Sequence, residues 1–333
     1  MSTLIVQIPC LNEADTLAAT LADLPRAIAG IDRIEILVVD DGSTDGTAEL
    51  ARTHGVHHVI SLRRTRGLAS AFRVGIDACL KLGADFIVNT DGDNQYAGRD
   101  IPKLVAPLLR GEADITIGDR NIPAAPHMSR GRKALQRLGS WIVRRVSGTR
   151  VPDTTSGFRG YTREAALRMV IVSEFSYTLE SIISAGKKRM AIAHVPVATN
   201  PRTRPSRLFG STWSYLKQSA STIVRIYTMY EPLKVFSFIG FATFGIGFAV
   251  SARFLYFYFT GSGAGHLQSL ILSAVLMIVG FQVLLIGLVA DVISANRKLI
   301  EDLLYRVRTL ELPSDGRAHT LTGSASRSQP LDQ

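Results

Sequence analysis

The sequence predicts an α/β domain with a mostly parallel sheet, followed by a transmembrane hairpin of two helices. Over roughly the first 200 residues, short apolar runs rich in β-branched side chains alternate with helical patterns. After residue 234 come two long stretches without a charged residue, at 235–252 and 267–290. At roughly 150 residues per domain, a chain of 333 residues has room for about two domains, which agrees with this division.

The elements of the first part follow one another as strand, then helix. We expect strands at 4–8, 34–39, 58–62, 86–90 and 115–117, and helices at 13–29, 47–53, 69–82 and 101–109. This order builds a sheet with helices on both faces, in which ligands bind beyond the carboxyl ends of the strands.

The two uncharged stretches are each long enough to cross a bilayer. As a helix, 267–290 reaches about 36 Å against a hydrocarbon core of about 30 Å, and 235–252 fits if Arg253 extends to the far interface. The bases Lys234, Arg297 and Lys298 flank the hairpin and favour the cytoplasm for both outer ends. We therefore expect a multi-pass protein of the cell membrane whose long N-terminal part is cytoplasmic.

Segments on either side of the hairpin complete the predicted organisation. We assign 1–205 to the α/β domain, 206–234 to a juxtamembrane amphipathic helix, 235–291 to the two spans, 292–312 to a cytosolic helix and 313–333 to a disordered tail. Within the cytosolic helix, Ile300, Leu303, Val307 and Leu310 repeat at helical spacing, so this face is expected to pack on another helix.

The net charge of +10 is concentrated in two segments. Eight basic residues lie between Arg120 and Arg150 without an acidic one, and a second basic segment, 201–234, leads into the first span. A membrane surface with anionic headgroups explains them better than nucleic acid, which we exclude as a partner because stacking aromatics are lacking. Two cysteines, Cys10 and Cys79, rule out a disulfide framework and a structural zinc site.

Polar clusters close three of the predicted strands, at 9–13, 40–47 and 89–95. Each could be turn chemistry alone, and for 40–47 both that interpretation and a ligand-binding site stay open. Asp91 and Asp93, with Gly92 between them, can both turn toward one Mg²⁺ or Mn²⁺ ion, and Gln95 adds a neutral oxygen. A P-loop and a GxGxxG fingerprint are both absent from the sequence.

Five motifs in this order resemble the family 2 glycosyltransferases, and within them the polyisoprenyl-phosphate glycosyltransferases. They are Pro9 with Asn12-Glu13, Val38 to Thr47, Asp91-Gly-Asp93 with Gln95, Gly118-Asp-Arg120, and Asp153 to Arg159. The resemblance implies a GT-A fold and an inverting transfer of a sugar from a nucleotide-sugar to a membrane polyprenyl phosphate, with a UDP-sugar favoured and GDP-mannose as the alternative. It also implies a homo-oligomer, since relatives can be tetramers.

The same resemblance implies roles for individual residues. The nucleoside would be held by Pro9, Leu11, Glu13, Val38 and Asp40; the metal by Asp91, Asp93 and Gln95; and the donor diphosphate by that metal, Gly92 and Arg120. Two departures from the family pattern occur: Arg66 replaces an Asn before Gly67, and 202–207 replaces the usual basic segment before the membrane.

The acceptor phosphate needs bases and an orienting carboxylate. We expect Ser129, Arg130, Arg132, Arg202, Arg204 and Arg207 to hold it, because Arg suits bidentate phosphate contacts. Asp153 is expected to be a base or an orienter of the acceptor, against the alternative that it only caps a turn. Glu180 could line the same site or merely begin a helix. A processive polysaccharide synthase is disfavoured, since its Gln-x-x-Arg-Trp motif is lacking, and a non-catalytic membrane scaffold is the remaining rival.

Overall fold

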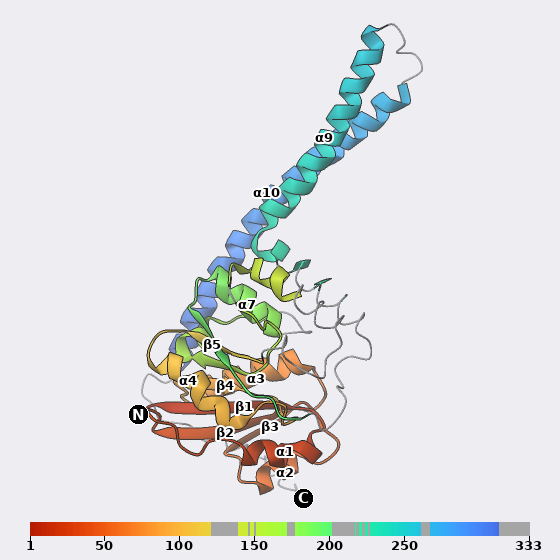
Figure 1. The fold of residues 1–333 in the computed structure, drawn as a ribbon. Helices are drawn as coiled ribbons and strands as arrows, with labels where there is room; N and C mark the ends of the chain where they lie inside the picture. Colours follow the sequence, from red (N-terminus) through yellow and green to blue (C-terminus); the bar gives the residue numbers. More distant parts are fainter. Residues whose placement is uncertain are drawn as a thin grey trace, which may run out of the picture.

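A computed structural model describes most of the chain (Figure 1). The described residues are 1–120, 139–145, 147–149, 151–171, 177–201, 227–260 and 267–312, together with 217, 220, 221, 224 and 225. All six predicted acceptor-phosphate residues and most of the predicted juxtamembrane helix lie outside these ranges, as does the segment 313–333.

Seven strands form one sheet in the order β3-β2-β1-β4-β6-β5-β7. The strands are β1 (Thr3–Cys10), β2 (Arg33–Asp40), β3 (His58–Ser61), β4 (Phe86–Asn89), β5 (Ile115–Asp119), β6 (Arg159–Thr162) and β7 (Ile192–Pro196). Among the named strands of the described residues, β6 runs antiparallel to its neighbours, β4 and β5, and the other pairings are parallel. The predicted mostly parallel α/β sheet is confirmed.

Helices cover both faces of the sheet and create two cores. They are α1 (Ala14–Ala22), α2 (Thr47–Thr53), α3 (Leu68–Lys81), α4 (Ile101–Leu109), α6 (Arg163–Arg168) and α7 (Tyr177–Lys187). Residues of α3, α6 and α7 fill one core, and residues of α1, α2 and α4 fill the other. The helix predicted over 13–29 ends at Ala22, because Pro25 disfavours helical backbone in the residue before it.

Two long helices, α9 (Pro232–Phe259) and α10 (Leu267–Glu311), rise together from the α/β domain (Figure 1). Both are long and apolar enough to cross a membrane, with mean hydropathies of 1.8 and 2.6 over 18-residue windows. The 45 residues of α10 are uninterrupted, so the predicted second span and the predicted cytosolic helix are one element about 67 Å long.

Glycines let the two long helices touch. A Cβ atom on Gly280 would lie 2.6 Å from the backbone nitrogen of Phe244, and one on Gly240 would lie 2.7 Å from the side chain of Leu284. The buried positions of α10 recur every seven residues, at Ser273, Gly280, Gly287, Ser294 and Glu301.

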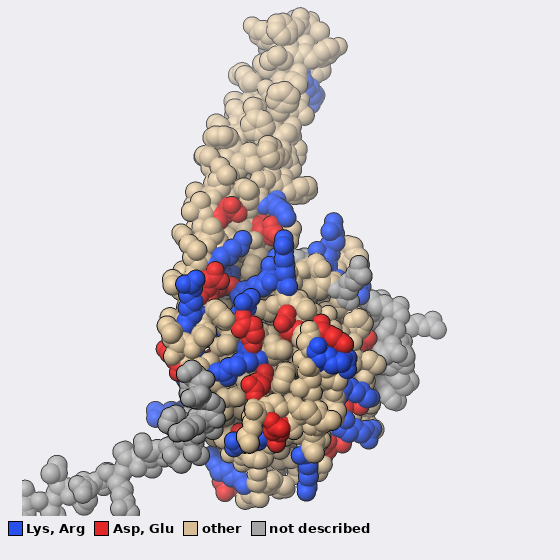
Figure 2. Space-filling model, turned by 90° about the vertical axis from the view of Figure 1, so that its left-hand side faces the viewer, with Lys and Arg blue, Asp and Glu red and all other residues tan. Residues whose placement is uncertain are grey.

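Polar contacts attach the C-terminal part of α10 to the α/β domain. Glu301 pairs with Lys188 at 2.9 Å, the Tyr305 hydroxyl donates to Glu164 at 3.0 Å, and Arg308 pairs with Asp77 at 3.2 Å. Charges of both signs gather at this junction, whereas the hairpin above it is almost uncharged on the visible face (Figure 2).

This contact corrects one prediction. The helix does pack on another helix, α6, but not through the predicted face. Ile300, Leu303, Val307 and Leu310 are 64, 60, 46 and 85% exposed. Sequence periodicity identified an apolar stripe correctly, and the polar side of the same helix makes the intramolecular contact.

Candidate active site

The loops that follow β1 and β2 are joined by hydrogen bonds at the carboxyl edge of the sheet. The amide of Asn12 donates to Ser43 Oγ at 2.8 Å, and its side-chain oxygen accepts from the Thr44 amide at 2.9 Å. Asn12 adopts a left-handed backbone with φ of 56°, which Asn tolerates better than most residues. The next amide, of Glu13, donates to Thr47 Oγ1 at 2.9 Å. The two polar clusters therefore form one rigid rim.

Asp40 and Asp41 support that rim from below. Both are 3% exposed. Asp40 accepts from the Ser43 amide at 3.0 Å, and the two oxygens of Asp41 accept from the amides of Arg66 and Gly67 at 2.8 Å each. Turn chemistry, one of the two interpretations of the segment 40–47, thus explains part of this motif. The role of Asp41, which fixes the loop after β3, was missed at the level of sequence.

The Asp91-Gly92-Asp93 segment follows β4 and is held by α1. Thr16 and Thr20 donate their hydroxyl hydrogens to the Gly92 carbonyl at 2.9 and 3.1 Å. A Cβ atom on Gly92 would lie 2.8 Å from Cys10 Sγ, so the backbone passes β1 too closely for a side chain. Asp93 accepts from the Gln95 amide at 3.1 Å. Helix α1 therefore fixes the position of the backbone between Asp91 and Asp93, and with it the position of both carboxylates.

The half-buried carboxyl of Asp91 has an environment that calls for a cation. Burial, Asp93 and Glu13 raise its pKa to about 7, although Arg120 and Arg159 act in the opposite direction. A divalent ion would offset both the burial and the repulsion between the two carboxylates. Among the described residues no group of three or more His, Cys, Asp and Glu side chains could hold a metal. Two carboxylates suit Mg²⁺ or Mn²⁺, ions that usually take their other ligands from water and phosphate.

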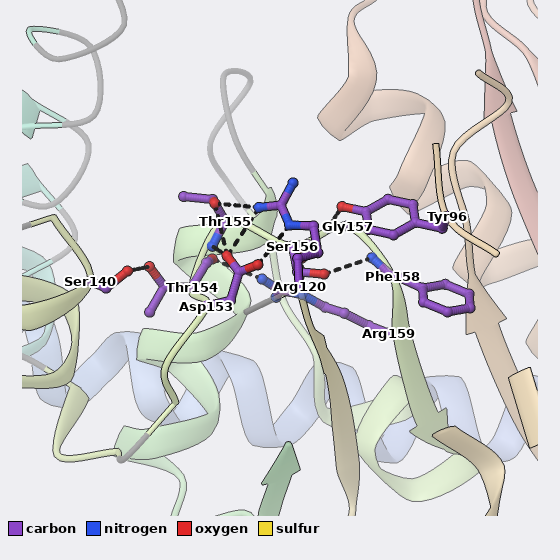
Figure 3. A network of polar contacts seen from close by, with 10 residues as sticks. All are labelled: Tyr96, Arg120, Ser140, Asp153, Thr154, Thr155, Ser156, Gly157, Phe158 and Arg159. Atoms are coloured by element: carbon purple, nitrogen blue, oxygen red, sulfur yellow. Dashed lines mark hydrogen bonds and ion pairs between the residues drawn. The ribbon is translucent and has the colours of Figure 1, made fainter. Parts of the chain in front are cut away.

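Arg120 and Asp153 form a closed ion pair beside this segment (Figure 3). Arg120 lies at the end of β5, and its Nε and Nη2 donate to the two oxygens of Asp153 at 2.7 and 3.1 Å. Nη2 also donates to Thr155 Oγ1 at 2.8 Å, and the guanidinium carbon lies 5.8 Å from the centre of the Tyr96 ring. The guanidinium is thereby locked in one orientation.

Asp153 suits a positioning role better than that of a base. Its side chain is 2% exposed. Burial alone would raise the pKa of Asp153, but the charge and hydrogen bonds of Arg120 and the hydrogen bonds from Thr155 outweigh burial and hold the pKa below its usual range. A carboxylate that is already paired and scarcely exposed is a weak proton acceptor.

Arg159 is a central residue that the sequence motif contained but to which no role was assigned. It is fully buried, and its guanidinium donates to the carbonyls of Thr154, Ser156 and Thr178 at 3.0, 2.7 and 2.9 Å, and to Ser181 Oγ. These bonds tie the loop 153–157 to α7. Only the clustering of this Arg with Ser, Thr and Gly could have signalled a loop anchor.

Gly157 lies between the loop and the carboxylates. Its amide donates to the Tyr96 hydroxyl at 2.9 Å, and its carbonyl accepts from Asn89 Nδ2 at 2.8 Å. A Cβ atom here would lie 2.9 Å from the Tyr177 hydroxyl and 3.1 Å from both oxygens of Asp91. The motifs that end at residues 95, 120 and 159 thus meet at one point.

The remaining predicted residues are distributed around this point. Leu11 is 38% exposed at the rim, while Pro9 is buried. Glu13 accepts from Thr16 Oγ1 at 3.0 Å. Val38 is fully buried, so its side chain belongs to the core beneath the site. Glu180 is 1% exposed inside α7 and does not line an open surface.

The comparisons with known proteins agree with this geometry. The model of the glycosyl transferase family 2 matches residues 5–169. Glycosyltransferase AglJ of Haloferax volcanii is 29% identical over 91% of this chain and 96% of its own length. The undecaprenyl-phosphate mannosyltransferase of Micrococcus luteus is 32% identical over 49% of this chain and 67% of its length. The dolichyl-phosphate hexose transferase of Haloferax volcanii is 30% identical over 59% and 82%.

Solved structures share the fold. Glucosyl-3-phosphoglycerate synthase from Mycobacterium tuberculosis, in complex with Mn²⁺, UDP-glucose and phosphoglyceric acid, superposes with a TM-score of 0.55 at 23% identity, over 68% of this chain and 80% of that one. The region matched by the family model contains the rim, both carboxylates, Arg120 and the loop 153–157, and relatives at 30% identity or more match over most of their length. From this agreement of sheet, site and relatives, the chain belongs to glycosyl transferase family 2.

Proposed function

We propose that this protein transfers one sugar, with inversion, from a nucleotide-sugar to the phosphate of a membrane polyprenyl phosphate. The observation that carries the proposal is the attachment of the Asp91 and Asp93 site to two helices able to span a membrane, through one uninterrupted α10. Relatives named for transfer to undecaprenyl and dolichyl phosphates support the same class of acceptor. The product is a polyprenyl-phosphate-linked monosaccharide.

The donor lies along the rim. Pro9, Leu11, Glu13 and Asp40 hold the nucleoside, either directly or by fixing the loop between them. Asp91 and Asp93, with Gln95, hold Mg²⁺ or Mn²⁺, which stabilises the charge of the departing nucleoside diphosphate when bound. Arg120, oriented by Asp153, faces the same diphosphate as a fixed positive charge.

The acceptor needs little help from a base. A phosphate monoester has a second pKa of about 6, so its nucleophilic oxygen is already largely ionised at pH 7. The position of the acceptor phosphate in line with the sugar matters more. We assign the task of holding the phosphate there to Ser129, Arg130, Arg132, Arg202, Arg204 and Arg207. The bases Lys234, Arg297 and Lys298, which flank the hairpin, support a cytoplasmic catalytic domain on the cell membrane.

The experiment is a transfer assay with full-length protein in detergent. Undecaprenyl phosphate is offered with Mn²⁺ or Mg²⁺ and a panel of UDP- and GDP-sugars, and a sugar-linked lipid is expected with one donor only. GDP-mannose belongs in the panel because one relative is named a mannosyltransferase. Asp91→Asn should abolish transfer. If no donor yields a lipid product while 3-phosphoglycerate is glycosylated, the proposed acceptor is wrong; no transfer to any acceptor favours the scaffold.

The role of Asp153 can be tested separately. Asp153→Asn should lower kcat at least tenfold, or about 1.4 kcal/mol, because Arg120 loses its orienting charge. The acidic limb of the kcat profile should keep its position, since a positioning carboxylate already ionised below its usual pKa does not set that limb. Loss of the limb in Asp153→Asn would instead identify Asp153 as the base.

A further inference from the structure

Two amide side chains are paired inside the sheet, at the point where β4 leads into the Asp91-Gly92-Asp93 segment. Gln7 of β1 and Asn89 of β4 are register partners, and both are fully buried. Gln7 Nε2 donates to Asn89 Oδ1 at 2.9 Å. The strand neighbours Ile8 and Val88 are buried apolar side chains, as is usual for a parallel sheet covered on both faces. We call Gln7 and Asn89 the buried amide pair.

A backbone carbonyl fixes the orientation of the buried amide pair. Asn89 Nδ2 lies 2.8 Å from the carbonyl oxygen of Gly157, which can only accept, so Asn89 has to present its NH₂ group there. The same NH₂ group donates to the Tyr177 hydroxyl at 3.0 Å, and the Tyr177 ring is stacked on Phe72 with ring centroids 4.0 Å apart. Asn89 Oδ1 therefore faces Gln7 as an acceptor. The whole hydrogen-bonding capacity of the Asn89 amide is directed by this arrangement.

Gln7 carries an unpaired atom as a result. Its Oε1 atom is buried and has no hydrogen-bond partner within the described part of the chain. Helix α3 passes so close to this atom that a Cβ atom on Gly75 would collide with it. An unpaired buried carbonyl costs folding free energy, which two apolar side chains at these positions would avoid. A polar pair that is kept at such a cost indicates a task other than packing.

The task follows from what Asn89 holds. No hydrogen bond from another described residue reaches the Asp91 carboxylate, so contacts with its surroundings set its orientation. A Cβ atom on Gly157 would lie 3.1 Å from both Asp91 oxygens, which means that the Gly157 backbone borders the carboxylate directly. This backbone is held from both sides. The Gly157 amide donates to the Tyr96 hydroxyl at 2.9 Å (Figure 3), and the Gly157 carbonyl accepts from Asn89.

We propose that Asn89 is a positioning residue, which fixes the backbone of Gly157 and, through that backbone, the orientation of the Asp91 carboxylate. The inference rests on the proposed function, in which Asp91 and Asp93 hold Mg²⁺ or Mn²⁺. Asn89 itself touches neither the metal nor a substrate. Residues that orient metal ligands in this indirect way typically change metal affinity by roughly 10- to 100-fold when they are replaced.

Titration with Mn²⁺ alone tests this role in full-length protein in detergent, with free Mn²⁺ measured by electron paramagnetic resonance. Asn89→Leu keeps the size of the side chain and removes both donors, so the Gly157 carbonyl is released. The dissociation constant for Mn²⁺ should rise roughly 10- to 100-fold. Gln7→Met combined with Asn89→Leu replaces the buried amide pair by an apolar pair. This double variant should melt close to wild type in EDTA and still bind Mn²⁺ as weakly as Asn89→Leu.

Thr116→Val is the matched control. Thr116 is a fully buried polar residue of the same sheet, and its hydroxyl lies against Gly160 instead of Gly157. The substitution preserves the shape of the side chain and should leave the Mn²⁺ affinity unchanged. Wild-type affinity in the folded double variant would overturn the proposal, because the buried amide pair would then serve packing alone. An equal loss of affinity in Thr116→Val would overturn it as well.

Kinetics give a second readout and separate this role from the proposed function. In the transfer assay at saturating Mn²⁺, the double variant should lose kcat by roughly tenfold or more, while KM for undecaprenyl phosphate keeps its wild-type value. A variant in which only that KM rises would contradict the assignment. If wild type binds Mn²⁺ more tightly than the double variant but transfers no sugar, the proposed function fails and the role of Asn89 stands.

Discussion

Asp91 is the residue at which the requirements of the candidate metal site and of folding stability conflict most clearly. Its pKa of about 7, above the ordinary value of 3.8, means that the folded metal-free protein holds a proton there that the unfolded chain would release. Stability should therefore fall as the pH rises from about 4 to about 7. Asp91→Asn should make the metal-free protein more stable at pH 8 by up to about 4 kcal/mol, with little difference at pH 4.

Thermal unfolding in EDTA at the two pH values measures this effect. Asp15→Asn, on the exposed side of α1, is the control and should leave the pH dependence unchanged. Addition of Mn²⁺ should stabilise wild type and not Asp91→Asn. A wild-type protein whose stability rises between pH 4 and pH 7 as much as in Asp91→Asn would refute the assignment.

Gly157 should tolerate no side chain. In Gly157→Ala the new Cβ atom would crowd the Tyr177 hydroxyl and both Asp91 oxygens, displacing the carboxylate by a few tenths of an ångström. We expect turnover to fall by roughly 10- to 100-fold, because small misplacements of catalytic groups are costly. Gly139→Ala, where a Cβ atom meets nothing within 4 Å, should retain wild-type activity. Kinetics of sugar transfer by both variants decide the matter.

At the scale of elements, the hairpin depends on close helix contact. Gly280→Ala should destabilise the hairpin by about 1–3 kcal/mol, because the added methyl group collides with the α9 backbone at Phe244 and cannot be moved aside. Gly245→Ala on α9 adds the same methyl group where nothing lies within 4 Å, and it should be neutral or slightly stabilising. Thermal unfolding in detergent compares the two, and equal melting temperatures would contradict the close contact.

The sequence predicted the strands that carry the site and missed those that complete the sheet. Continuous apolar runs identify β1, β2 and β4, because buried parallel strands need them. Strand β6 is the short sequence Arg-Gly-Tyr-Thr, whose pairing between β4 and β5 depends on contacts far along the chain. The paired glycines Gly240 with Gly247 and Gly280 with Gly287, each seven apart, were a readable signal of helix contact that the hydropathy pattern obscured.

The sequence predicted the candidate site only in part, for the same reason as it predicted the sheet only in part. Spacing alone indicated a cation at Asp91 and Asp93, because both carboxylates come from one turn. The Arg120 and Asp153 pair joins residues 33 positions apart, and only the fold brings them together. That pairing, rather than the motif itself, favours a positioning carboxylate over a base, and the kinetics of Asp153→Asn test the choice.

At the scale of the whole molecule, Arg308 is one of the residues that connect the hairpin to the catalytic domain. Its guanidinium reaches Asp77 on α3, the carbonyl of Leu167 in the last turn of α6 and the carbonyl of Met169 just after α6. Arg308→Ala should loosen α6, seen as faster amide hydrogen exchange there, since hydrogen bonds to a charged group contribute about 1.5–3 kcal/mol each. Transfer to a lipid acceptor should fall more than hydrolysis of the nucleotide-sugar by water.

Lys298→Ala serves as the matched control, because Lys298 is an exposed cation ten residues earlier on the same helix. Unchanged exchange in α6 with Arg308→Ala, or an equal loss of transfer and hydrolysis, would show that the junction does not orient the domain.

Because α10 is one unbroken helix, a change in its length moves the α/β domain relative to the hairpin and in most cases also turns it. Each residue inserted between the hairpin and Glu301 would lift the catalytic domain by about 1.5 Å and turn it by about 100° around the helix axis. A single insertion would swing the sheet edge to another side of the hairpin, whereas seven residues nearly restore its direction and raise it by about 10 Å. The distance of the α/β domain from the hairpin can therefore change without turning the domain only by insertions close to whole turns, such as about seven, eleven or eighteen residues.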